Sequence, residues 1–202
     1  MTQPAFRTAI VDYIRAQANP TEKFSHQPRL YRLARQLAEN KPYDDDVLHA
    51  AVWMHDLGVF IGHRPEDPVD LAAWDNLVYV TKRTPDLLRQ FGFPEQKIPA
   101  TLEVIRTHLP SAKPTCFEGH LMRDADLLEQ LGAVGILRTV CKVGRDTRFV
   151  QFADALKSLR RAVETLPGQL ELASSRRLAE PRVAVLRTFL AAAEAEADPS
   201  EL

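Results

Sequence analysis

Glycine and cysteine are scarce in this sequence, and long apolar runs are absent. Its 202 residues include eight glycines and two cysteines. Neither the glycine-rich turn of dinucleotide-binding folds nor the phosphate-binding loop of P-loop enzymes is present, so neither class has support. Two cysteines, Cys116 and Cys141, do not make a disulfide framework, and we expect a cytoplasmic protein. No apolar run reaches the roughly 18 residues that a membrane-spanning helix needs, so we expect no membrane partner.

An excess of charge of one sign is also lacking. The chain carries 26 lysines and arginines against 27 aspartates and glutamates, a formal net charge of −1. A protein that binds nucleic acid through a broad basic face would show an excess of positive charge, so we expect no nucleic-acid polymer as a partner. The length is sufficient for one domain with a sizeable core, or for one domain with a helical extension.

Apolar residues recur at helical spacing along most of the chain, and no stretch shows the alternation of a β-strand. No internal repeat is present. The fold class is therefore predicted to be all-α. The predicted helices cover residues 4–18, 26–37, 45–57, 70–79, 85–91, 98–108, 118–131, 133–143 and 148–166, and a last helix begins near Pro181.

The stretch from Ala50 to Gly58 is the most informative part of the sequence. It is almost wholly apolar until it reaches His55 and Asp56, which is typical of a buried helix, and Gly58 is expected to end that helix. A histidine and an aspartate buried without partners would be costly. A divalent metal is the partner that best satisfies a neutral imidazole beside a carboxylate. The alternative is a satisfied core histidine with a capping aspartate.

Two other histidines precede this pair. His26 lies one helical turn before Leu30 on the apolar face of its predicted helix, so its side chain is expected to point inward. An inward histidine is a ligand only if partners lie beside it, and otherwise it belongs to the core. His49 lies six residues before His55, about 600° around the same helix, so we do not expect it to be a ligand. The three acids at 44–46 fit the start of that helix, where the macrodipole favours negative charge.

Several polar residues after the pair allow both structural and functional interpretations. The loop at 59–68 contains His63, which is either a substrate contact or a solvated loop residue. His108 ends a predicted helix, where a histidine caps the dipole, orients another group or holds a phosphate. Asp124 and Asp126 lie about 200° apart on their helix and cannot both face one site. The helical wheel alone places Asp124 nearer the apolar stripe.

Three motifs in the chain resemble those of the HD superfamily of metal-dependent phosphohydrolases. They are H-x-x-R-L at 26–30, A-V-W-M-H-D-L-G at 51–58 and R-D-A-D-L-L at 123–128. The run at 130–138 is similar to a segment of a bacterial branch that includes nucleotide pyrophosphatases. The resemblance covers about residues 20–150. It implies an HD-domain helical bundle as the core of a single domain over 1–202, with extra C-terminal helices at about 148–197.

By this resemblance, two histidines and two aspartates hold one divalent ion: His26, His55, Asp56 and Asp126. Asp126 is selected over Asp124 because Ala125-Asp126 falls on the family's A-D. A mixed nitrogen and oxygen set suits manganese, iron, nickel, cobalt or magnesium. His55 and Asp56 would be the catalytic pair. The remaining assignments are substrate contacts by Arg29, His108 and His63, and orientation of the ligands by Asp124 and Glu118.

The chain also departs from parts of the family. Some branches place an acidic residue three or four positions after the HD aspartate, where this chain has Val59 and Phe60. The resemblance therefore does not extend to the alarmone hydrolases or the 5′-nucleotidase branch. The arginine of the family's D-R-L is Leu127 here, which puts any contact through that arginine in doubt.

The function implied is hydrolysis of a nucleotide or other small phosphate ester or pyrophosphate through a metal-activated water. Two alternatives remain open. One is a non-phosphate enzyme on the same fold, because residues 24–29 resemble a region of cyanamide hydratase relatives. The other is a metal-binding regulatory domain without turnover. The expected partner is a small phosphorylated substrate, and the C-terminal helices are expected to pack on the core or to form a homodimer surface.

Overall fold

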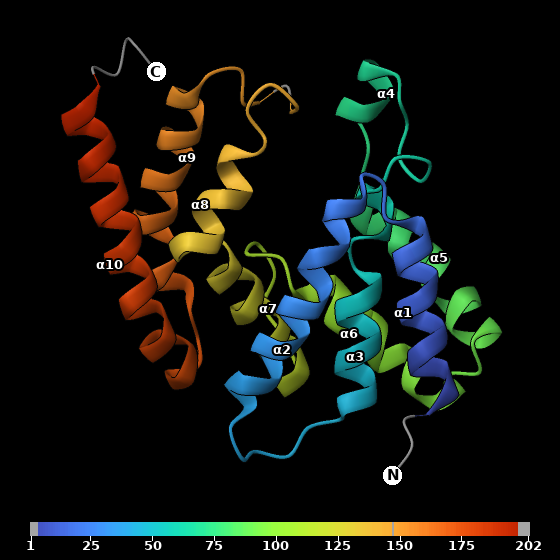
Figure 1. The fold of residues 1–202 in the computed structure, drawn as a ribbon. Helices are drawn as coiled ribbons and strands as arrows, with labels where there is room; N and C mark the ends of the chain where they lie inside the picture. The colour runs from blue at the N-terminus through green and yellow to red at the C-terminus, as the bar shows by residue number, and fades with distance from the viewer. Residues whose placement is uncertain (1–3, 147, 198–202) are drawn as a thin grey trace. The chain divides into compact units, whose positions relative to one another are not determined.

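The computed structural model describes residues 4–146 and 148–197. Within these residues, ten α-helices and four short 3₁₀ turns make up the regular structure, and no strand is present beyond an isolated bridge between Ile61 and Arg64 (Figure 1). The prediction of an all-α fold is confirmed. No helix in this part of the chain is both long enough and apolar enough to cross a membrane.

The chain forms two compact units, Met1–Arg123 and Asp124–Leu202. The first contains α1 to α6, the second contains α8 to α10, and α7 (Phe117–Glu129) runs through the boundary. The single domain expected from the sequence, with a core at about 20–150, stays a prediction. The other helices are α1 (Ala5–Gln17), α2 (His26–Ala38), α3 (Asp45–Met54), α4 (Pro68–Ala72), α5 (Asn76–Gln90), α6 (Ile98–Thr107), α8 (Gly132–Val140), α9 (Phe152–Thr165) and α10 (Ala173–Glu196).

Helix α3 is the centre of the first unit. Every residue from Val47 to Met54 is buried, as the apolar run predicts. Helices α1, α2, α5 and α6 pack against it. The helix delivers His55, its C-terminal neighbour, into the interior, so the local sequence and the packing agree on where the first functional candidate lies.

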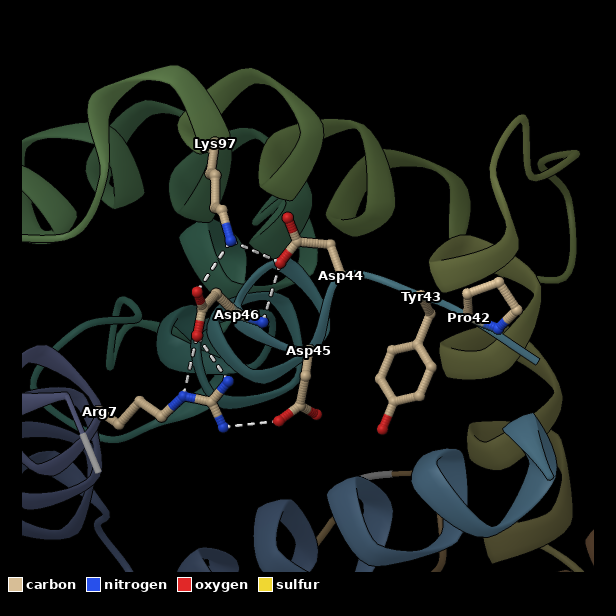
Figure 2. Close-up of a pocket in the computed structure, with 7 residues that line it drawn as sticks. All are labelled: Arg7, Pro42, Tyr43, Asp44, Asp45, Asp46 and Lys97. Carbon is tan, nitrogen blue, oxygen red and sulfur yellow. Dashed lines mark hydrogen bonds and ion pairs between the residues drawn. The ribbon is translucent and has the colours of Figure 1, made fainter. Parts of the chain in front are cut away.

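Charged residues gather at the other end of α3, where Figure 2 shows a shallow hollow. The Asp44 side chain accepts hydrogen bonds from the backbone of Asp46 and Val47, so the expected role of these acids at the helix start is confirmed. Lys97 Nζ lies 2.9 Å from Asp44 Oδ1 and 2.8 Å from Asp46 Oδ2. Arg7 pairs with Asp46, and its Nη1 lies 2.7 Å from Asp45 Oδ2. These ion pairs therefore connect α1, and the turn that precedes α6, to the start of α3.

Three features of the predicted helices are wrong. The helix expected at 70–79 is split into α4 and the start of α5, and α5 continues through Pro85 to Gln90. It continues because Val80, Thr84, Leu87 and Leu88 form one buried stripe across the proline. The last helix begins at Ala173, eight residues before Pro181, and the physical reason lies in a cap from α7.

The third correction concerns Gly58, which the sequence predicts as the residue that ends the helix. The helix ends at Met54, and Gly58 lies in a following 3₁₀ turn (Leu57–Val59) without a positive φ. Its lack of a side chain serves a close approach instead. A Cβ at this position would lie 2.5 Å from Asn76 Oδ1 and 2.9 Å from Tyr79 Cδ1.

Asp124, in the part of α7 that belongs to the second unit, supplies the cap of α10. Its carboxylate is fully buried and accepts hydrogen bonds from the backbone N–H groups of Glu171 and Leu172 and from Ser175 Oγ. Helix α10 has no capping side chain from its own N-cap residue. The carboxylate therefore satisfies donors that the start of the helix would otherwise leave without partners.

Candidate metal centre

Three side chains converge in the first unit at the C-terminal end of α3. His26 is the first residue of α2, His55 follows the last residue of α3, and Asp56 is next to it. One ligand atom from each lies within 4.8 Å of the other two. His55 Nε2 is 3.3 Å and His26 Nε2 is 3.8 Å from Asp56 Oδ2. The structure thus brings together three of the four predicted ligands.

The spacing of these atoms fits a shared divalent ion. Metal bonds of about 2.0 to 2.2 Å to nitrogen and oxygen place neighbouring ligand atoms about 3 to 4 Å apart. The separations of His55 Nε2 and His26 Nε2 from Asp56 Oδ2, 3.3 and 3.8 Å, fall in that range. His26 and His55 are buried, whereas the Asp56 side chain is 27 % exposed.

The protonation of His55 follows from its hydrogen bond. Its Nδ1 lies 2.8 Å from the carbonyl oxygen of Val52, which can only accept, so Nδ1 carries the proton. The lone pair of a neutral ring is then on Nε2, the atom that faces Asp56. Hydrogen bonds of this kind fix the orientation of metal-binding imidazoles.

His108 is held by the same local device at the end of α6. Its Nδ1 lies 2.6 Å from the carbonyl oxygen of Ile105, and its ring centroid is 5.1 Å from that of His55. His108 is also buried. The structure places the His108 ring beside the candidate ligands. Which of its three possible roles it has, as a helix cap, an orienting group or a phosphate contact, stays open.

The surrounding imidazoles control the charge of Asp56. Burial alone raises the pKa of this carboxyl group, but in the metal-free protein a protonated His55, with its positive charge and a hydrogen bond donated from Nε2, outweighs that effect, with smaller contributions from the charges of His26 and His108. The result is a pKa below the ordinary value of an aspartate. The side chain is therefore ionised, as a metal ligand must be.

The other predicted substrate contacts lie in different surroundings. His63 bonds through Nδ1 to the Tyr79 hydroxyl at 2.8 Å and through Nε2 to Gln17 Oε1 at 2.7 Å. Burial, together with the charge of Arg83, lowers its pKa. His63 thus links α1 to α5, and a substrate contact by it stays a prediction. Arg29 is half-buried on α2, one turn after His26.

The structure does not bring Glu118 to the cluster. Its Oε1 accepts a hydrogen bond of 2.6 Å from the backbone N–H of Asp44, at the start of α3. The ten residues of α3 separate that end from His55 by about 15 Å at 1.5 Å per residue. Glu118 therefore supports the helix that carries the site, and a direct role in orienting its ligands stays a prediction.

Asp124 and Asp126 have different surroundings within the second unit. The Asp124 carboxylate is already used by three donors at the start of α10. Asp126 is half-buried on the same helix. The helical wheel favoured Asp124 because its face is indeed buried, but that burial serves the cap. The motif's choice of Asp126 as a metal ligand stays a prediction.

Sequence reasoning missed two side chains that contact the turn after α3. Asn76 donates from Nδ2 to the carbonyl oxygen of His55, and Trp74 donates from Nε1 to that of Gly58, each at 2.9 Å. Both lie in a segment that the sequence presents as an ordinary amphipathic helix. Nothing in its periodicity indicates these contacts, because they join residues 21 and 16 positions apart.

The chain resembles known proteins in its structure and not detectably in its sequence. No protein-family model matches the chain, and no curated protein does. The structure of Bacillus subtilis YpgQ in complex with ADP is similar, with 19 % identity, a TM-score of 0.71 and coverage of 95 % of this chain and 98 % of that one. An HD-superfamily hydrolase from Bacillus thuringiensis has 19 % identity and a TM-score of 0.69, covering 94 % and 95 %.

A predicted HD superfamily hydrolase from an uncultured Thermotogales bacterium extends the comparison. It shares 22 % identity and a TM-score of 0.63 over 94 % of this chain and 91 % of that one. Sequence identities this low carry information about the fold. The chain therefore has the fold of the HD-superfamily hydrolases, which confirms the fold that its motifs imply.

Proposed function

We propose that this protein is a metal-dependent hydrolase that acts on a nucleotide or another small phosphate ester or pyrophosphate. The observation that carries the proposal is the convergence of His26, His55 and Asp56, with ligand atoms within 4.8 Å of one another. The fold shared with HD-superfamily hydrolases supports it. The ADP bound in the YpgQ structure favours a nucleotide as the substrate class.

The donor set fits a hard or borderline divalent ion: manganese, iron, nickel, cobalt or magnesium. Asp126 is the proposed fourth ligand on the strength of the R-D-A-D motif. When bound, such an ion supplies a Lewis acid that polarises a phosphate oxygen and lowers the pKa of water. Imidazole and carboxylate ligands suit all five of these metals.

The chain's own residues supply binding and orientation. The hydrogen bond from His55 Nδ1 to Val52 fixes its ring, and the ionised Asp56 faces the same point. His108, held by Ile105, has its ring 5.1 Å from that of His55, and in this proposal it holds a phosphate oxygen. Arg29, one turn from His26, adds a positive charge that favours an anionic substrate.

The test combines metal content with turnover. Protein purified without added metal is analysed by mass spectrometry for bound metal, and then screened with manganese against nucleotides and p-nitrophenyl phosphate. We expect near-stoichiometric metal and release of phosphate or pyrophosphate, with both lost in Asp56→Ala. His49→Gln, which changes another buried histidine six residues away on α3, is the matched control and should retain both.

Each result decides between the functional classes. Absence of metal under every supplement would overturn the proposal and leave His55 and Asp56 as core structure. Stoichiometric metal without phosphate release would favour the alternatives, a cyanamide-hydratase-like enzyme or a regulatory metal-binding domain. Val59 and Phe60, which stand where some HD branches have an acidic residue, favour the regulatory alternative, and the resemblance of residues 24–29 favours the hydratase-like one.

A further inference from the structure

The peptide between the two adjacent candidate ligands is held from outside its own helix. Helix α3 ends at Met54, so the carbonyl of His55 lies beyond the regular hydrogen-bonding ladder. Asn76, the first residue of α5, donates its Nδ2 hydrogen to that carbonyl at 2.9 Å. This bond fixes the plane of the peptide that joins His55 to Asp56.

That peptide plane determines where both ligands point. The backbone of Asp56 has φ −103° and ψ 11°, in the sparsely populated bridge between the helical and extended regions. Adjacent residues on a regular helix point about 100° apart, so a turn of the chain here is what lets both reach one ion. An external hydrogen bond to the intervening carbonyl is a direct way to keep that turn.

The fit of Asn76 against the turn is close and costly to maintain. A Cβ on Gly58 would lie 2.5 Å from Asn76 Oδ1, so glycine is what allows the amide to approach. Asn76 Oδ1 is buried and has no hydrogen-bond partner among the described residues. A buried polar atom left in this state lowers stability, which argues that the amide is placed for the bond that Nδ2 makes.

A second side chain from the same segment holds the other end of the turn. Trp74 Nε1 donates to the carbonyl of Gly58 at 2.9 Å, three residues after His55. Together, Asn76 and Trp74 hold the backbone on both sides of Asp56. Residues at and just before the start of α5 therefore restrain the backbone that carries His55 and Asp56.

We infer that Asn76 is a positioning residue that makes His55 and Asp56 converge on one ion. The inference rests on the proposed function, because it assumes that the pair binds metal. It assigns to α5 a role in the site, although α5 supplies none of the predicted ligands. Outer partners of this kind typically alter metal affinity by 10- to 100-fold when they are removed.

The experiment compares manganese affinity in the full chain by isothermal titration calorimetry. Asn76→Asp keeps the size of the side chain but replaces the donating amide by a carboxylate, and Asn76→Ala removes it. We expect both to weaken manganese binding by about tenfold or more at a temperature where circular dichroism shows an intact fold. The electron paramagnetic resonance spectrum of bound manganese should change as well.

Asp75→Ala is the matched control for a merely structural effect. Asp75 caps α5 through the backbone N–H of Val78, so its loss destabilises the same helix end without touching His55. We expect a lower melting temperature with manganese affinity within about twofold of wild type. Equal weakening in Asp75→Ala and Asn76→Asp would overturn the inference, as would an unchanged affinity in Asn76→Asp.

A metal-free measurement separates this inference from the proposed function. In the wild-type chain and in Asn76→Asp, the imidazole signals of His55 are compared by NMR without added metal. A shift in the variant supports the positioning role even if wild-type protein binds no manganese, in which case only the proposed function fails. Identical His55 signals would overturn the positioning role whatever the metal result.

Discussion

Replacing Asp124 by alanine should destabilise the second unit more than any other single change at a helix end. The buried carboxylate accepts from three donors, two at the start of α10 and the Ser175 hydroxyl at 2.5 Å. At about 1.5 kcal/mol for each hydrogen bond to a charged group, the loss would reach about 4.5 kcal/mol. Relief of the desolvation of the carboxylate offsets part of it, so we expect about 3 kcal/mol. Asp124→Asn keeps an acceptor and should cost about half as much.

Urea unfolding followed by circular dichroism measures this effect. With a slope of about 2 kcal/mol per molar urea, 3 kcal/mol moves the midpoint by about 1.5 M. Both tryptophans, Trp53 and Trp74, lie in the first unit, so fluorescence followed in parallel reports whether that unit unfolds with the second. Ser175→Ala, which removes one of the three donors, should cost about 1 kcal/mol.

The control is Glu180→Ala, an exposed position on α10 that should change stability by less than about 0.5 kcal/mol. A midpoint for Asp124→Ala within 0.5 M of wild type, in urea where the slope is about 2 kcal/mol per molar, would refute the reasoning. It would mean that water or a rearranged backbone satisfies the start of α10 as well as the carboxylate does.

Two further predictions concern the first unit. Burial, with the charge of Arg7, lowers the pKa of His49 from 6.5 to about 4. A depressed pKa means that the unfolded chain binds the proton first, so stability is fully present above pH 6.5 and falls as the pH drops toward 4. Urea midpoints across this window should show a shallower pH dependence in His49→Gln, and an unchanged dependence would contradict the assignment. Gly58→Ala should cost about 1 to 3 kcal/mol, because its Cβ would overlap Asn76 Oδ1, and an unaltered melting temperature would show that α5 can move away.

The centre of the first unit could be predicted from sequence because its signals are local. A run that is apolar on every side can only be a buried helix, and α3 is buried from Val47 to Met54. The position of His26 on the inner face of its helix was likewise readable from periodicity. The motif resemblance predicted that His26, His55 and Asp56 lie together, and the structure brings their side chains together.

The features that sequence reasoning missed depend on residues far apart in the chain. Helix α10 starts early because Asp124, 51 residues before Ser175, satisfies its first donors. A glycine is needed at position 58 because the Asn76 side chain approaches it closely. Rules about helix ends take no account of such a contact. A helical wheel measures only how apolar a face is, so it could not tell that the buried face of Asp124 served as a cap. Contacts of this kind are settled by the tertiary fold and not by propensity.

The ion pairs at the start of α3 have an evolutionary consequence. Arg7 pairs with the carboxylates of Asp45 and Asp46, Lys97 pairs with that of Asp46 as well, and the Arg7 side chain is only 11 % exposed. Losing one cation alone leaves a poorly solvated negative charge, whereas losing a matched cation and carboxylate together removes both. Substitutions at these positions should therefore arise in compensating pairs among descendants of this chain. A lineage that replaces Arg7 by an apolar residue is expected to have neutralised position 45 or 46 as well.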